Sequence, residues 1–281
     1  MKKFLYIGAG LLAFILGIMI WFYLAEPTGK AASKDLPAPP AITAKQAILI
    51  DGKSGEILFE KAAEERAYPA STTKIMTAFM ALELCRRYDI AIDTEVTVPK
   101  EAVSIEGSSI YLKAGETRII EDLLYGAMLR SGNDAATALA ICLGGNEANF
   151  VKMMNGKAAE LGCRQTRFQN PTGLFDENHY TTSKDLARIA RAAMENDIFR
   201  QISASKSWGT YTNKNKTLFQ YEGGTGIKIG FTEKSGRTLV ASATRGDSSI
   251  IAVVLNDSNW FADAYALMDY GFTIKGEKQH E

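Results

Sequence analysis

Residues 68–82 read YPASTTKIMTAFMAL and place a serine, Ser71, three positions before a lysine, Lys74, in an otherwise apolar stretch. From Ile75 onward the apolar residues cover nearly the whole circumference of a helix, which is typical of a buried helix. Pro69 favours an extended conformation at the residue before it, so we place Ser71 at the N-cap or in the first turn. Residues three apart share one helix face, and the lysine amine can therefore reach the serine hydroxyl.

This pair has two interpretations. A buried ammonium group without a partner is costly, so Lys74 either has a partner or is held partly neutral. A neutral lysine beside a serine is a base beside a nucleophile. Alternatively, Ser71 only caps the helix and Lys74 extends to solvent, because Ser-x-x-Lys occurs by chance in many chains.

The composition restricts the classes of partner and site. Of the 281 residues 46% are apolar, and the 32 acidic residues balance the 32 basic ones. This balance indicates no nucleic-acid or polyanion partner. Only His179 and His280 occur, so we expect no histidine-rich metal site. A Ser-His-Asp triad would have to use His179, but its polar segment ENHYTTS favours a structural or surface histidine.

The three cysteines, Cys85, Cys142 and Cys163, show no C-x-x-C spacing. Cys85 and Cys142 lie in apolar helical stretches, where we expect core thiols. A disulfide between Cys142 and Cys163 is the alternative.

The N-terminus has an uncharged apolar run at 4–25, after Lys2 and Lys3. As a helix these 22 residues measure about 33 Å, enough to cross a bilayer. We predict a transmembrane anchor or signal segment at 1–25, a proline-rich linker at 26–44 and a catalytic domain at 45–281. An uncleaved anchor gives a single-pass cell-membrane protein with an extracytoplasmic domain, whereas cleavage gives a secreted one.

The remaining chain has strands at both ends and helices between. Residues 47–61 read as a hairpin, and helices follow, including 146–161 and one that starts near Thr182 in a pattern close to a capping box. From about residue 207 the periodicity changes to strands, and a last helix is predicted over 258–271. We predict an α/β (α+β) fold in which the N-terminal hairpin joins the C-terminal strands in one antiparallel sheet. The predicted strand segments are KSWGTYT, GIKIGFT, RTLVASATR and SSIIAVVLN.

Three short motifs carry the chemistry. They are S-T-T-K at 71–74, S-G-N at 131–133 between two predicted helices, and K-I-G at 228–230 on a predicted strand. One class of serine acyl-transferases carries S-x-x-K, S-D-N and K-T-G in this order. Order, spacing and context together are specific, although S-G-N or K-x-G alone would mean little. Asp134 we interpret as a helix-start charge rather than a catalytic acid.

Longer stretches resemble the D-alanyl-D-alanine carboxypeptidases, the low-molecular-mass penicillin-binding proteins. The resemblance runs from about residue 47 to residue 272 and includes LLYGAMLRSGNDAATALA, FQNPTGL and GTGIKIGFTEKSGRTLVASATR. It implies a β-lactamase- or transpeptidase-like fold, with the site between an antiparallel sheet and a helical lobe. It implies peptidoglycan stem peptides as substrate, β-lactams as covalent inhibitors, and no metal or organic cofactor.

The resemblance also implies the role of each motif residue. Ser71 would attack the carbonyl between two D-alanines, Lys74 would be the base, and Ser131 would relay a proton to the leaving amine. Burial and the charge of Lys228 would lower the pKa of Lys74, and the N–H groups of Ser71 and Phe231 would form an oxyanion hole. The implied substrate-binding residues are Asn133, Lys228, Gly230, Phe231 and Thr232.

The chain departs from this family in two places. Ile229 replaces the K-T-G threonine, whose hydroxyl helps bind the terminal carboxylate of the substrate. The family often has a basic residue after the last strand, but 256–268 contain none, and Trp260 lies near that place. We therefore expect weaker carboxylate recognition. An active D,D-peptidase, either carboxypeptidase or endopeptidase, is the leading interpretation. The alternatives are an inactive peptidoglycan-binding homologue and a β-lactamase. Against a β-lactamase, this sequence has no E-x-x-L-N-like segment between the second and third motifs.

Overall fold

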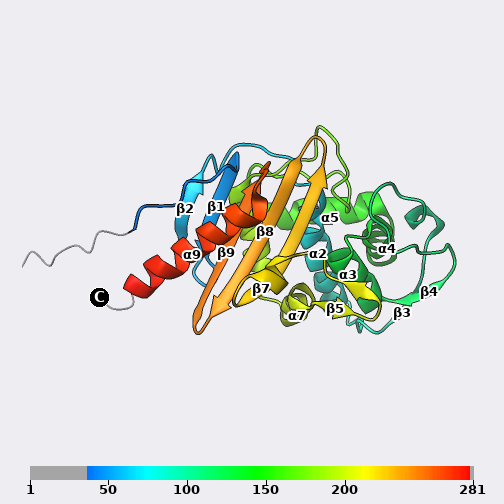
Figure 1. Cartoon of the computed structure of the whole chain (residues 1–281). Coiled ribbons are helices and arrows are strands. Elements are labelled where there is room, and N and C mark those ends of the chain that lie inside the picture. The colour runs from blue at the N-terminus through cyan, green and yellow to red at the C-terminus, as the bar shows by residue number, and fades with distance from the viewer. Residues whose placement is uncertain (1–36, 279–281) are drawn as a thin grey trace, which may run out of the picture. The chain divides into compact units, whose positions relative to one another are not determined.

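A five-stranded sheet joins the two ends of the folded chain (Figure 1). The computed structural model describes residues 37–278. All neighbouring strands of this sheet are antiparallel. The prediction that the N-terminal hairpin joins the C-terminal strands is therefore confirmed. The strand order is β2 (Ile57–Lys61), β1 (Gln46–Asp51), β9 (Ser248–Leu255), β8 (Gly236–Arg245) and β7 (Gly224–Thr232).

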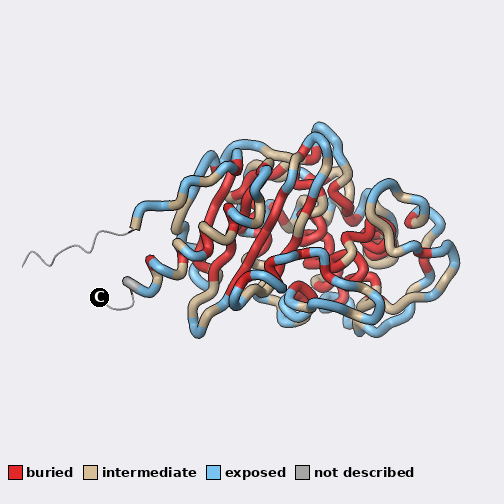
Figure 2. The backbone as a smooth tube through the Cα atoms, viewed as in Figure 1, coloured by how far each residue is buried: buried red, intermediate tan, exposed pale blue. Residues whose placement is uncertain are grey.

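The central strand β9 is buried on both faces, as Figure 2 shows for the middle of the sheet. Successive side chains of a strand point to opposite faces. Accordingly Ile251 and Val253 belong to one apolar cluster, and Ile250 and Val254 belong to the other. The nearly unbroken apolar run SSIIAVVL is thus explained by a layer of helices on each side.

The larger cluster lies between the sheet and most of the helices. Helix α2 begins at Lys74 and is buried along most of its length, as its all-round apolar sequence predicted. Thr182 accepts a hydrogen bond from the N–H of Asp185, which confirms the helix start predicted there. The helices of this side and of the lobe are α2 (Lys74–Arg87), α3 (Ile120–Leu129), α4 (Asn133–Gly144), α5 (Glu147–Glu160), α6 (Ser183–Met194) and α7 (Asp197–Ala204).

Helix α9 (Trp260–Lys278) covers the other face, with the short α8 (Thr217–Gln220) nearby. The predicted end at residue 271 is wrong, because the helix continues for seven more residues. Ile274 is buried and Lys275 pairs with Asp51 of β1. These contacts with the sheet support the extra turns.

The segment KSWGTYT forms a separate two-stranded hairpin rather than a strand of the main sheet, with β5 at Ser207–Trp208 and β6 at Tyr211–Thr212. The ring of Trp208 stacks on Tyr125 of α3, with the ring centroids 4.1 Å apart. This aromatic contact fixes the hairpin against the helical lobe. A second small pair is β3 (Glu95–Thr97) with β4 (Thr117–Ile119), and two 3-10 turns are η1 (Ala70–Thr73) and η2 (Lys100–Ala102).

The Cys142–Cys163 disulfide is absent, because both thiols are free. Their sulfurs contact different backbone carbonyls, that of Thr97 for Cys142 and that of Asp185 for Cys163. Cys85 is a buried core thiol as expected, but Cys142 is only half-buried.

The predicted segment at 1–25 and the first part of the linker lie outside the described residues. Residues 37–44 contain no helix or strand. Between residues 37 and 278, no helix is both long and apolar enough to cross a membrane.

Candidate active site

The S-T-T-K motif forms the turn η1 and the first residue of α2. Ser71 lies inside this first turn, and the N-cap residues are Pro69 for η1 and Thr73 for α2, so the N-cap alternative is wrong. Ala70 has φ +49°, and Gly173 packs directly on it. A Cβ on Gly173 would lie 1.8 Å from the carbonyl oxygen of Ala70, which only glycine avoids. The backbone before Ser71 is therefore held by a close contact with residue 173.

Lys74 is fully buried, and three oxygen atoms surround its Nζ. Nζ lies 2.7 Å from Asn133 Oδ1, 2.6 Å from the Thr172 carbonyl oxygen and 3.1 Å from Ser71 Oγ. A neutral amine has two N–H bonds and one lone pair. If the two carbonyl-type oxygens accept the N–H bonds, the lone pair is left for the hydroxyl of Ser71. The geometry is thus that of a base beside a nucleophile.

Burial also favours the neutral amine of Lys74. Desolvation is the largest cause that lowers its pKa well below the ordinary value, and the positive charges of Lys228 and Lys214 lower it further. The carboxylate of Asp134 acts in the opposite direction but does not compensate. A lysine amine with a lowered pKa can accept a proton near neutral pH.

The S-G-N motif connects α3 to α4 through Ser131, whose φ is +64°. Such a conformation is uncommon for a residue with a side chain and often marks a functional position. Here it places the Ser131 hydroxyl 3.0 Å from Lys228 Nζ, which donates to it. Asn133 is held from two sides, since its Nδ2 donates to the Glu106 carbonyl at 2.5 Å while its Oδ1 accepts from Lys74.

The K-I-G motif lies on β7, which is an edge strand of the sheet. Lys228 is 1% exposed, and burial, together with the charge of Lys214, lowers its pKa to about 7. Its Nζ also donates to the carbonyl of Ile229 at 3.0 Å. Gly230 allows the strand to approach Ser71, because a Cβ there would lie 2.8 Å from the Ser71 nitrogen.

Further along β7 the two remaining predicted residues lie near the β7–β8 turn. Phe231 is 62% exposed beside the edge. The hydroxyl of Thr232 donates to Ser235 Oγ at 2.7 Å and accepts from the Ser235 N–H at 3.0 Å. The structure therefore brings together all three motifs, with Thr232 engaged in the adjoining turn.

Asp134 and His179 have structural contacts, as expected. Asp134 is buried and accepts hydrogen bonds from the N–H groups of Ile110 and Leu112, which fastens the segment before α3 to α4. His179 is buried beside Thr73, whose Oγ1 lies 2.9 Å from its Nε2, and desolvation lowers its pKa to about 4. Neither side chain contacts Ser71.

Sequence reasoning missed three contributors to the site. Thr172 and Glu106 act through backbone carbonyls, and Lys214 acts through its charge on both buried lysines. The segment FQNPTGL signals the first of these, since Asn170 Oδ1 accepts from the N–H groups of Thr172 and Gly173 and so shapes that turn.

An antiparallel sheet, a helical lobe and a serine–lysine pair where they meet define the class of serine acyl-transferases with S-x-x-K motifs. The family model of the D-alanyl-D-alanine carboxypeptidases matches residues 33–259. The chain belongs to this family of serine hydrolases.

Individual proteins with these names are also similar to this chain. The D-alanyl-D-alanine carboxypeptidase DacF of Bacillus subtilis is 35% identical, over 92% of this chain and 69% of its own length. DacC of Escherichia coli is 34% identical, over 90% of this chain and 66% of its own. The Streptomyces K15 DD-transpeptidase is 33% identical in sequence to this chain. Its crystal structure matches with a TM-score of 0.79, over 84% of this chain and 99% of the transpeptidase chain.

Proposed function

We propose that this protein is a serine D,D-peptidase that cleaves the D-Ala-D-Ala bond of peptidoglycan stem peptides through an acyl-enzyme on Ser71. The observation that carries this proposal is the environment of Lys74. Its buried Nζ has two carbonyl-type acceptors and, as its third neighbour, the Ser71 hydroxyl. The names of the matched relatives support the choice of substrate.

In the acylation step, Lys74 Nζ takes the proton of the Ser71 hydroxyl while Oγ bonds to the carbonyl carbon. The N–H groups of Ser71 and Phe231 stabilise the resulting oxyanion, which the close approach of β7 to η1 supports. The C–N bond then breaks, and the leaving D-alanine amine receives a proton through Ser131. The contact of Ser131 with Lys228 supports this relay. Water finally hydrolyses the ester.

The substrate backbone would lie along the edge strand β7, which has no sheet neighbour on that side among the described residues. An extended peptide can pair with such an edge by β-strand addition. Asn133 on one side and Thr232 at the end of β7 would contact the peptide. The amine of Lys228 would contribute positive charge from the same strand, next to Ser131.

Purified muropeptides test the proposal. The full-length chain, purified in mild detergent, should release D-alanine from monomeric pentapeptides, as identified by mass. Cleavage of cross-linked dimers instead would identify an endopeptidase. Binding of muropeptides without any product would contradict the proposed function and favour a non-hydrolytic wall-binding protein.

Ile229→Thr should raise kcat/KM toward a peptide with a free terminal carboxylate by about ten- to a hundredfold, because a hydrogen bond to a charged group contributes about 1.5–3 kcal/mol. The Ile229 side chain packs against the apolar cluster under α9. Threonine is also β-branched, so its methyl group can keep part of that contact while its hydroxyl is available at the edge.

The control for Ile229→Thr is the same peptide with an amidated C-terminus, which should gain little. Tm has to be measured in parallel, since the smaller side chain leaves a void that costs about 1 kcal/mol or more. Equal gains on both peptides would show that residue 229 does not set carboxylate selectivity.

We also propose that the uncharged run at 4–25 anchors the protein in the cell membrane, with the catalytic domain outside. The length of this run and the lysines before it support the proposal. The full-length chain should remain in the membrane pellet after an alkaline carbonate wash, and its recovery in the supernatant would contradict anchoring.

A further inference from the structure

An arginine lies next to the place where the family's carboxylate-binding groups are missing. Arg237 is on β8, directly opposite Phe231 of the edge strand β7. Leu239, two residues further on, is opposite Ile229. Arg237 is therefore the diagonal neighbour of Ile229, a separation that long side chains can bridge.

Arg237 lies on the α9 face of the sheet together with Ile229. Side chains at alternate positions share a face, and Leu239 and Ile229 both pack in the cluster that α9 covers. Only the edge strand β7, whose Gly230 lies close to Ser71, therefore separates the backbone of Arg237 from that edge of the sheet. Neighbouring strands are about 4.8 Å apart, and an extended arginine side chain is longer than this spacing.

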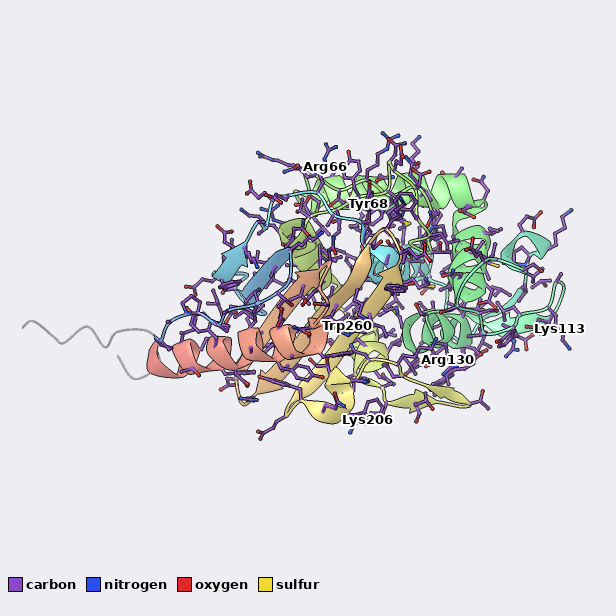
Figure 3. The ribbon with its side chains drawn as sticks, turned by 45° about the horizontal axis from the view of Figure 1, so that its top comes forward. Arg66, Tyr68, Lys113, Arg130, Lys206 and Trp260 are labelled. Atoms are coloured by element: carbon purple, nitrogen blue, oxygen red, sulfur yellow. The ribbon has the colours of Figure 1, made fainter. Side chains whose placement is uncertain are left out.

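The guanidinium group of Arg237 is already positioned by the segment after β9. Its Nη1 donates to the carbonyl of Ser258 at 3.4 Å, and its Cζ lies 6.0 Å from the ring centroid of Trp260. Figure 3 labels Trp260 where α9 begins against the sheet. The ring of Trp260 thus lies where the family's basic residue is expected. It contacts Arg237, a basic residue that comes from β8.

This cation has no anionic partner among the residues that the structure describes. Arg237 is exposed and forms no ion pair within residues 37–278. By contrast Arg245, at the other end of β8, lies 3.6 Å from an oxygen of Asp269. The contact with Ser258 is longer than an ordinary N–H···O hydrogen bond, so a stronger acceptor can replace it.

We propose that Arg237 binds the C-terminal carboxylate of the substrate and supplies from β8 the cation that residues 256–268 lack. The inference rests on the proposed D,D-peptidase function and adds a residue that determines specificity for a free carboxylate. A guanidinium group binds a carboxylate through two parallel N–H···O bonds. Trp260 is the positioning residue, because its ring holds the guanidinium group near the end of β9 until a carboxylate at the β7 edge provides a stronger acceptor.

Arg237→Gln tests the inference in the full-length chain in mild detergent. It should lower kcat/KM for a peptide ending in free D-Ala-D-Ala by about ten- to a hundredfold, with little change for the C-terminal amide. Arg237→Lys should restore part of the loss, since it keeps the charge but not the paired N–H groups. If the amide turns over too slowly to measure, benzylpenicillin and its methyl ester can be compared by their acylation rates. They provide the same contrast between a free carboxylate and a neutral group.

Arg245→Gln is the matched control, because it removes an arginine from the same strand far from the β7–β8 turn and should leave both substrates unaffected. A loss in Arg237→Gln that is equal for the acid and the amide, or no loss for the acid, would overturn the inference while the proposed function stands. A wild-type chain that neither cleaves the peptides nor takes up penicillin would overturn both. Tm of Arg237→Gln should match that of the wild type, because the side chain is exposed.

Discussion

Ser71→Ala should abolish turnover of a peptide ending in D-Ala-D-Ala, lowering kcat at least about ten-thousandfold, as removal of a catalytic serine does elsewhere. Without Oγ there is no atom to form the acyl-enzyme, and the base Lys74 has no proton to accept. The fold should survive, because Ser71 is half-buried and is the N-cap of neither η1 nor α2. D-alanine release under saturating substrate measures the effect.

The control for Ser71→Ala is Ser207→Ala on the separate β5–β6 hairpin, which removes an exposed serine away from the three motifs. It should keep wild-type kcat and Tm. Wild-type turnover in Ser71→Ala with an unchanged fold would exclude the serine as nucleophile.

Lys74→Met should lower the rate of acylation by about a hundred- to ten-thousandfold, the range found for general bases. Methionine has a similar length but cannot accept the proton of Ser71. The substitution also leaves Asn133 Oδ1 and the Thr172 carbonyl without the donor they share. An acceptor left unsatisfied costs about 1–3 kcal/mol, so Tm must be measured with the acylation rate. A wild-type rate in Lys74→Met would contradict the assignment of the base.

The pH dependence of acylation gives an independent check on Lys74. A base acts when it is deprotonated, so the rate should rise with pH through the pKa of Lys74, which burial holds well below its ordinary value. Lys228→Gln removes a positive charge that disfavours protonated Lys74. The pKa of Lys74 should therefore rise, and the acid limb of the profile should move to higher pH.

Lys152→Gln is the control for this shift, since Lys152 is exposed on α5 and its charge lies outside the site. It should leave the midpoint of the profile unchanged. An identical midpoint in Lys228→Gln and in the wild type would contradict the coupling between the two buried lysines.

Local sequence signals were enough to predict the main parts of this fold and site. The apolar circumference after Ile75 predicted a buried helix, and the change of periodicity near residue 207 predicted the C-terminal strands. The S-x-x-K spacing predicted that the amine of Lys74 reaches Ser71, because an i, i+3 pair follows from helix geometry alone. The observed distance of 3.1 Å agrees.

Other features depend on contacts between distant segments and could not be predicted in this way. The acceptors on Lys74 and Asn133 include the carbonyls of Thr172 and Glu106, which any residue type could supply. Arg237 becomes relevant only once the register of β7 and β8 is known. The C-terminal extension of α9 depends on its ion pair with β1, which no local pattern reveals.

Intact-mass analysis of the full-length chain with benzylpenicillin tests whether Ser71 is an activated nucleophile. We expect one adduct with the mass of the drug, located by peptide mapping on residues that include Ser71 and absent from Ser71→Ala. An unmodified wild-type mass after long incubation at high drug concentration, with the drug itself intact, would contradict the claim that Ser71 is an activated nucleophile.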